Sequence, residues 1–121
     1  MENFLSIPSE RIIFEDDFFF IIRDIYPVSP GHSLIISKTW KRDYFELSEL
    51  ERQYLDKAIF KAKELIELDF QPDGYNIGMN CGEFAGQTVF HFHCHLIPRY
   101  KGDMENPRGG VRHVIEGKGY Y

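Results

Sequence analysis

Residues 91–97 alternate between histidine and apolar side chains, and this pattern constrains the fold more than any other feature. Three histidines occupy every second position: His91, His93 and His95. Phe92, Cys94 and Leu96 occupy the positions between and after them. In a β-strand, residues two positions apart point to the same face. We therefore expect a strand within residues 89–100, with three imidazoles on its open face and a core behind it.

One long helix is predicted from residue 48 to about residue 68. Ser48 and Glu51 form a capping box, which is typical of a helix N-terminus. Apolar residues then recur at helical spacing: Leu55, Ala58, Ile59, Ala62, Leu65 and Ile66. The turn residues at positions 72–74 end the pattern. The polar face of this helix carries no functional signal.

Short apolar segments on both sides of the helix predict strands. Residues 11–25 form two strands around a turn at Asp16-Asp17, and residues 32–37 form a third. The loop before the third strand is too short for a crossover helix, which favours an antiparallel arrangement. Residues 75–81 alternate strictly and add another strand. We predict an α+β fold: a single domain over residues 1–121, with an irregular tail over residues 101–121.

Composition limits the partners that the chain can have. Its 121 residues include 14 Lys+Arg against 19 Asp+Glu, a net charge of -5, which disfavours binding along nucleic acid. Two cysteines cannot supply a disulfide framework. Neither an apolar run of about 18 residues nor a signal peptide is present. We expect a cytoplasmic protein without membrane or nucleic-acid partners, which can still bind one small phosphorylated ligand locally.

Three imidazoles on one strand face permit two kinds of chemistry. They could ligate zinc, because histidine is its commonest nitrogen ligand. However, same-face residues lie about 6.6–7 Å apart, so one flat strand does not easily surround a single ion. Alternatively, one imidazole acts as a nucleophile while its neighbours orient it and stabilise the developing charge. The residues alone leave both open.

The segment from His91 to Ile97 resembles the His-φ-His-φ-His-φ-φ signature of the histidine triad superfamily of nucleotide hydrolases and transferases. Further landmarks of the same family occur in the same order: residues 11–17, Asp24, residues 30–32, Asn80, residues 85–89 and residues 98–99. The resemblance covers about residues 4–115. It implies an antiparallel sheet that continues across a homodimer.

The resemblance also implies the roles of four histidines. His93 would attack an α-phosphorus and form a nucleotidyl-histidine intermediate, which suits an imidazole that is neutral near pH 7. His95 would donate a hydrogen bond to the non-bridging phosphate oxygens, and His91 would support the arrangement. His32 would be an auxiliary histidine that reaches in from the neighbouring strand.

Further polar residues would contact the substrate according to the same resemblance. Asn80, Gly86, Gln87 and Thr88 would surround the phosphates, with Thr88 near the leaving group. Asp24 would bind the ribose hydroxyls. By residue type alone, most of these positions read more simply as loop or surface residues.

Apolar residues are the candidates for holding the base. Ile22, Ile25 and Phe4 could enclose it, although such side chains more often belong to a core. In the tail, Arg108 and Arg112 are suited to polyphosphate, and the family uses this segment to tune substrate choice.

The favoured function is a nucleotide hydrolase that cleaves dinucleoside polyphosphates or nucleoside phosphoramidates at the α-phosphate. Many relatives carry a Cys-x-x-Cys zinc site near the start, whereas residues 1–6 contain no cysteine. We therefore expect no metal and no cofactor, apart from magnesium that accompanies the substrate. Two alternatives remain: a nucleotide-binding sensor with negligible turnover, and a zinc-dependent hydrolase that uses the same histidines.

Overall fold

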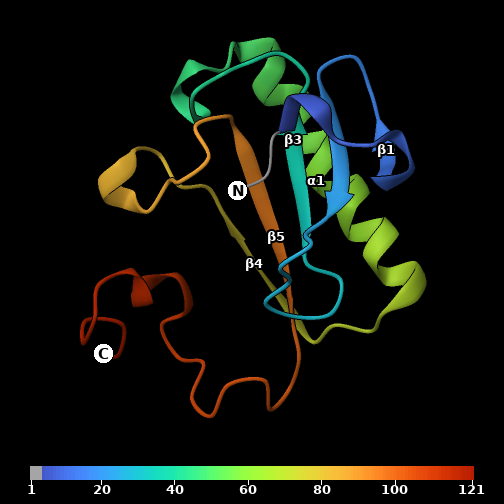
Figure 1. Cartoon of the computed structure of the whole chain (residues 1–121). Helices are drawn as coiled ribbons and strands as arrows, with labels where there is room; N and C mark the ends of the chain where they lie inside the picture. Colours follow the sequence, from blue (N-terminus) through green and yellow to red (C-terminus); the bar gives the residue numbers. More distant parts are fainter. Residues whose placement is uncertain (1–3) are drawn as a thin grey trace.

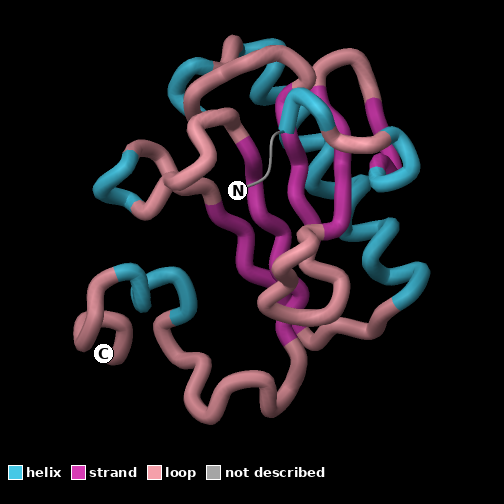
Figure 2. Tube along the Cα trace, viewed as in Figure 1, coloured by secondary structure: helices cyan, strands magenta, loops and turns pink. Residues whose placement is uncertain are grey.

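A five-stranded sheet forms the centre of the computed structural model, which describes residues 4–121 (Figures 1 and 2). Its strands are β1 (Ile12–Glu15), β2 (Phe19–Arg23), β3 (Ser33–Ser37), β4 (Gly74–Gly78) and β5 (His93–Arg99). They lie in the order β1-β2-β3-β5-β4, and every neighbouring pair is antiparallel. The predicted α+β class is confirmed.

The single α-helix, α1 (Glu49–Asp69), packs across one face of this sheet, against β2, β3 and β5 (Figure 1). It begins where the sequence predicts. The Ser48 hydroxyl accepts from the Glu51 N–H at 3.1 Å, and the Glu51 carboxylate accepts from the Ser48 N–H at 2.8 Å. At the other end, the Arg23 guanidinium donates to the Leu65 carbonyl at 3.3 Å. The helix start is thus capped locally, and a hydrogen bond from β2 ties the last turns of the helix to the sheet.

The helix-covered face is an apolar core built from alternate strand residues. Its fully or nearly fully buried members are Phe19, Ile21, Ile35, Leu47, Leu55, Ala58, Ala62, Ile66, Phe92, Cys94 and Leu96. Burial raises the pKa of the Cys94 thiol to about 12, so this cysteine is an inert core residue, as the alternation predicts.

The opposite face of the sheet is also partly covered, which the sequence did not predict. A second apolar cluster contains Phe4, Phe20, Ile22, Leu34 and Ile36. The N-terminal segment covers it with two short 3-10 helices, η1 (Phe4–Ser6) and η2 (Ser9–Arg11). Strands β2 and β3 are therefore buried on both faces. The two histidines of β5, His93 and His95, lie at the border of this apolar cluster.

Two predicted segments differ from the structure. The strand expected within residues 89–100 starts only at His93, because the chain before it leaves the ladder: the Phe92 N–H donates to the Lys41 carbonyl at 2.6 Å. The tail after residue 100, which was expected to be irregular, contains a 3-10 helix, η5 (Gly110–Val114). Within the tail, the His113 Nε2–H donates a hydrogen bond to the Arg108 carbonyl at 2.8 Å.

The remaining short elements are η3 (Tyr44–Glu46) and η4 (Glu83–Ala85). Among residues 4–121, no helix has both the length and the apolar character required to cross a membrane.

Candidate active site

His93 and His95 project from the sheet face that the N-terminal segment covers. In the register of β3 and β5, His93 lies opposite Ile36 and His95 opposite Leu34. Both histidines border a cavity of about 200 Å³. The complete lining is Phe4, Asp24, Tyr26, Leu34, Thr88, Val89, His93 and His95. Within residues 4–121, this cavity brings together the predicted nucleophile His93, the carboxylate of Asp24 and the hydroxyl of Thr88.

His91 is buried and does not line this cavity, so only two of the three predicted imidazoles are open to a ligand, although the Phe4 ring contacts both His91 (5.8 Å between centroids) and His93. The residue is 5% exposed, and its Nε2 lies 2.7 Å from the Ser37 carbonyl oxygen and 3.2 Å from the Ser37 hydroxyl. Since a carbonyl oxygen only accepts, Nε2 carries the proton. His91 is thus an anchor between β3 and the start of β5. The supporting role implied by the resemblance stays a prediction.

His93 is oriented by the backbone of His91. The Nδ1 atom of His93 lies 2.9 Å from the His91 carbonyl oxygen, so Nδ1 carries the proton and donates. In the neutral ring the lone pair is then on Nε2. Phe4 contacts the same ring edge-on, with 5.0 Å between centroids. The backbone contact thus places the proton of His93 on Nδ1, and the Phe4 contact restricts the orientation of the ring.

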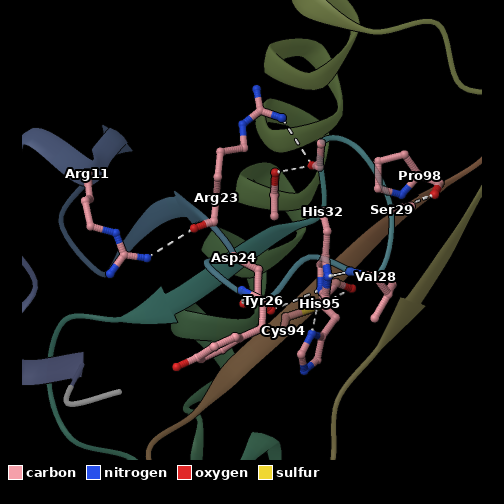
Figure 3. A network of polar contacts seen from close by, with 12 residues as sticks. Arg11, Arg23, Asp24, Tyr26, Val28, Ser29, His32, Cys94, His95 and Pro98 are labelled. Carbon is pink, nitrogen blue, oxygen red and sulfur yellow. Dashed lines mark hydrogen bonds and ion pairs between the residues drawn. The ribbon is translucent and has the colours of Figure 1, made fainter. Parts of the chain in front are cut away.

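His95 has the opposite tautomer, and His32 determines it (Figure 3). The backbone N–H of Val28 donates to His32 Nδ1 at 3.2 Å, so the neutral ring of His32 carries its proton on Nε2. His32 Nε2 lies 2.9 Å from His95 Nδ1, which must therefore accept. The proton of His95 is then on Nε2. One cavity thus contains a nitrogen lone pair on His93 and an N–H donor on His95.

Burial keeps the rings of His32 and His95 uncharged near neutral pH. The pKa of His95 is lowered to about 4 by burial and by the neighbouring imidazoles His93 and His32, against the attraction of Asp24. Burial also lowers the pKa of His32, and the Asp24 carboxylate partly opposes that shift. The neutral tautomers of His32 and His95 are consequently the ones present under ordinary conditions.

Asp24 directly follows β2 and lines the cavity beside His32 and His95 (Figure 3). Its side chain is 12% exposed, and one oxygen lies 3.5 Å from His32 Nε2. The other oxygen accepts from the Tyr26 N–H at 2.9 Å. A carboxylate has about four acceptor positions, so these contacts leave capacity for hydroxyl groups.

Asp24, His32 and His95 also bring one ligating atom each within 4.8 Å of one another, a spacing that a metal ion could use. The hydrogen-bonding pattern fits a metal poorly. A metal needs the lone pair of His32 Nε2, whereas the Val28 N–H requires that nitrogen to carry the proton. The absence of a metal role stays a prediction.

Three of the four predicted phosphate contacts do not border the cavity. Gln87 is 3% exposed, and its amide is engaged with the backbone of Gly82, Arg42 and Val89. This side chain builds the loop. Asn80 and Gly86 are neighbours of each other: Gly86 has a left-handed φ of +93°, and a Cβ atom there would lie 3.9 Å from the Asn80 amide nitrogen. Thr88 does line the cavity.

The predicted base contacts are distributed differently from the expectation. Ile22 is fully buried in the second core and presents no surface to a ligand. Ile25 is 49% exposed and does not line the cavity. Phe4 does line it. The structure adds Tyr26 and Val89, for which the sequence gave no specific signal.

Leu34 and Ser37 were also missed, for different reasons. Leu34 follows from the alternation of β3 once that strand is paired with β5. The contact of Ser37 with His91 spans 54 residues and has no local signal. Arg108 and Arg112 stack on the Tyr121 ring at 4.7 and 4.8 Å, and neither lines the cavity.

An antiparallel sheet in which a His-x-His-x-His segment meets a fourth histidine defines a histidine triad protein. The HIT domain family matches residues 6–102, so the chain belongs to this family.

Relatives of known sequence and structure agree with this assignment. The chain is 44% identical to Protein hit of Bacillus subtilis over 100 residues, covering 81% of this chain and 68% of that protein. It is 34% identical to a bis(5'-adenosyl)-triphosphatase of Dictyostelium discoideum, covering 83% and 67%. A crystal structure of a HIT family protein from Bacillus anthracis is 41% identical with a TM-score of 0.71, covering 76% and 65%. The chain thus spans about two thirds of the length of these relatives.

Proposed function

We propose that the protein is a metal-independent nucleotide hydrolase that cleaves at the α-phosphate through a nucleotidyl-His93 intermediate. The observation that carries this proposal is the pair of opposite tautomers. His93 presents a lone pair on Nε2 and His95 an N–H donor, both at one cavity. A binding module would need donors for phosphate, but it would not need a nucleophilic nitrogen beside them.

The proposed reaction has two displacements. His93 Nε2 attacks the α-phosphorus, a P–N bond forms, and the bond to the leaving group breaks with its electron pair. The leaving group takes up a proton from solvent, and the His91 carbonyl stabilises the positive charge on the His93 ring through Nδ1–H. Water then attacks the phosphorus and loses a proton to solvent, the P–N bond breaks with its electron pair returning to His93 Nε2, and nucleoside monophosphate leaves. His95 donates to a non-bridging oxygen in both steps.

Dinucleoside polyphosphates are the first substrate class that we propose, and nucleoside phosphoramidates are the second. The Dictyostelium relative is a bis(5'-adenosyl)-triphosphatase, which supports the first class. The cavity of about 200 Å³ is smaller than a typical ligand pocket and suits the phosphate and ribose portion. Asp24 would bind the ribose, Thr88 would lie near the leaving group, and magnesium would enter only with the substrate.

We further propose a homodimer. Strand β4 is an edge of the sheet, and Ile77 on it is 48% exposed. An unpaired edge with an exposed apolar side chain favours pairing with a second copy. Arg108 and Arg112 lie on the tail beside β4 and could act in a partner's site. Sedimentation at micromolar concentration should give twice the chain mass, and a monomer would contradict the dimer.

The test of the activity is a substrate panel with monophosphate release as the readout. Dinucleoside polyphosphates and nucleoside phosphoramidates are incubated with the parent and with His93→Ala, before and after exhaustive chelation. We expect turnover by the parent alone, retained after chelation. Binding without turnover would favour the sensor. Activity lost on chelation and restored by stoichiometric zinc would favour the zinc hydrolase.

A further inference from the structure

We propose that the backbone N–H of Val28 is a positioning group that fixes the tautomers of His32 and His95. This inference rests on the proposed function, since it explains how His95 presents a donor to phosphate. The Val28 N–H lies 3.2 Å from His32 Nδ1, and His32 Nε2 lies 2.9 Å from His95 Nδ1 (Figure 3). One backbone donor thus sets the proton positions of two successive rings.

The loop that carries Val28 is held at several points, so its N–H has a defined direction. Pro27 and Pro30 restrict the backbone on both sides of it. Three further hydrogen bonds anchor the loop: Ser29 Oγ to the Pro98 carbonyl (2.6 Å), Tyr100 Oη to the Pro30 carbonyl (2.6 Å) and Arg23 Nη1 to the Gly31 carbonyl (3.1 Å).

Gly31 closes this loop in a conformation that other residues rarely adopt. Its φ is +90°, and a Cβ atom there would lie 3.0 Å from the Phe70 ring and 3.3 Å from Pro98. The chain therefore returns directly into His32, whose own N–H donates to the Ser29 carbonyl at 3.1 Å. The donor at Val28 and the acceptor at His32 belong to one closed turn.

Loss of the Val28 N–H would have an effect beyond His32. His32 could then carry its proton on Nδ1, and its Nε2 lone pair would face His95 Nδ1. To avoid two facing lone pairs, His95 would move its proton to Nδ1 and present a lone pair to the phosphate oxygen. The contact between His95 Nε2 and the phosphate oxygen would change from attractive to repulsive. The Val28 side chain is 70% exposed, so the backbone, rather than side-chain packing, carries this role.

The first test is nitrogen-15 NMR of the parent protein without substrate. We expect an Nε2–H tautomer for both His32 and His95. We also expect scalar couplings across two N–H···N hydrogen bonds, from Val28 N to His32 Nδ1 and from His32 Nε2 to His95 Nδ1. A protonated His32 Nδ1, or no coupling from Val28, overturns the proposal without any substitution and without reference to turnover.

The second test removes the donor. Val28→Pro deletes the N–H, and Val28→Ala keeps it and serves as the reference. We expect kcat of Val28→Pro to fall about three- to tenfold below the reference, the range of one ordinary hydrogen bond, with a mixed His32 tautomer. A folded Val28→Pro protein with unchanged tautomers and kcat within about twofold of the reference overturns the proposal.

Two further outcomes separate this inference from the proposed function. If Val28→Pro does not fold, Ser29→Ala replaces it: loss of the anchor to Pro98 should broaden the His32 tautomer signals. Unchanged signals in Ser29→Ala count against a fixed loop and overturn the proposal. If the parent shows the expected tautomers and turns over no nucleotide, the hydrolase proposal fails and the positioning role of Val28 stands.

Discussion

The two faces of the sheet are built by the same strands but differ in the side chains that they carry and in how these are held. On the helix-covered face, Ile35 of β3 lies opposite Cys94 of β5, and both are completely buried. One position along, Leu34 lies opposite His95 on the other face. The first face gains its stability from apolar burial. The second combines an apolar patch with imidazoles whose protons are set by backbone groups.

This difference shows how a small protein can hold histidines in defined positions. The helix-covered core fixes the strand register, and that register fixes where His93 and His95 emerge. Backbone donors and acceptors then determine which ring nitrogen carries the proton. Substitutions on the helix face should therefore change stability, and substitutions on the site face should change catalysis.

The largest effect is expected for His93→Ala. Loss of the nucleophile should lower turnover by about 10³- to 10⁶-fold, as when nucleophiles are removed elsewhere. Nucleotide affinity should change by about tenfold or less, since Asp24 and His95 remain. Single-turnover kinetics and equilibrium binding measure the two quantities. A variant that keeps a tenth of the parental turnover would contradict the role of His93.

Ile35→Ala is the corresponding change on the helix face. Ile35 is completely buried, so its truncation should lower the free energy of unfolding by about 2–5 kcal/mol. Urea denaturation measures this, with Ile35→Val as a milder control expected to cost about 0.5–1.5 kcal/mol. The kcat of the folded fraction should stay near that of the parent. A large loss of kcat would show that the two faces are coupled.

Asp24→Ala tests ribose binding on the site face. If the carboxylate accepts both hydroxyls, kcat/KM should fall by an equivalent of about 1.5–3 kcal/mol, the range for hydrogen bonds to a charged group. A 2'-deoxy substrate should be discriminated less by the variant than by the parent. Asp24→Asn is the matched control of similar shape. Equal discrimination by parent and variant would remove Asp24 from the ribose site.

Acidification should weaken the fold through His95. Its pKa is about 4 in the folded protein against the ordinary histidine value of 6.5, so the unfolded chain binds the proton first. Stability from this residue is complete above pH 6.5 and is lost as pH falls toward 4. The loss should reach about 2 kcal/mol near pH 4.5, allowing for solvent screening. His95→Gln should remove that part of the pH dependence, measured by urea denaturation. If the free energy of unfolding varies with pH in the same way for the parent and for His95→Gln, the prediction is contradicted.

The smallest effect concerns the helix terminus. Ser48→Ala removes one half of the capping box and should cost about 1 kcal/mol of stability. Thermal denaturation measures this change, and Ser48→Asp, which can still cap, should recover most of it. Turnover should not change, because this residue lies on the helix side of the molecule. Altered catalysis would again connect the two faces.

Local patterns in the sequence were sufficient for the helix and the strand types. The capping box at Ser48 located the helix start, and the Asp16-Asp17 turn located the first hairpin. Alternation at Cys94 and Leu96 identified the core face of β5. These features depend on neighbours a few residues away, which a single sequence displays directly.

The parts that could not be predicted depend on contacts across long sequence separations. His91 is buried away from the cavity because the carbonyl of Ser37, 54 residues earlier, accepts a hydrogen bond from its Nε2–H. Gln87 was expected to bind phosphate, and instead donates to the Arg42 carbonyl 45 residues away. The backbone donor of Val28 has no side-chain signature at all. Family resemblance indicated the histidines themselves, but not that His32 sets the position of the proton on His95.

The most direct test of the account is to identify the residue that becomes nucleotidylated during turnover. The parent is mixed with substrate, quenched in base within the first turnover, and digested for mass spectrometry, with His93→Ala as the control. The account predicts a nucleoside monophosphate on His93 that is stable to base and labile to acid, and none in the control. A parent enzyme that turns over at full rate while the nucleotide is found on another residue, or on none, would contradict it.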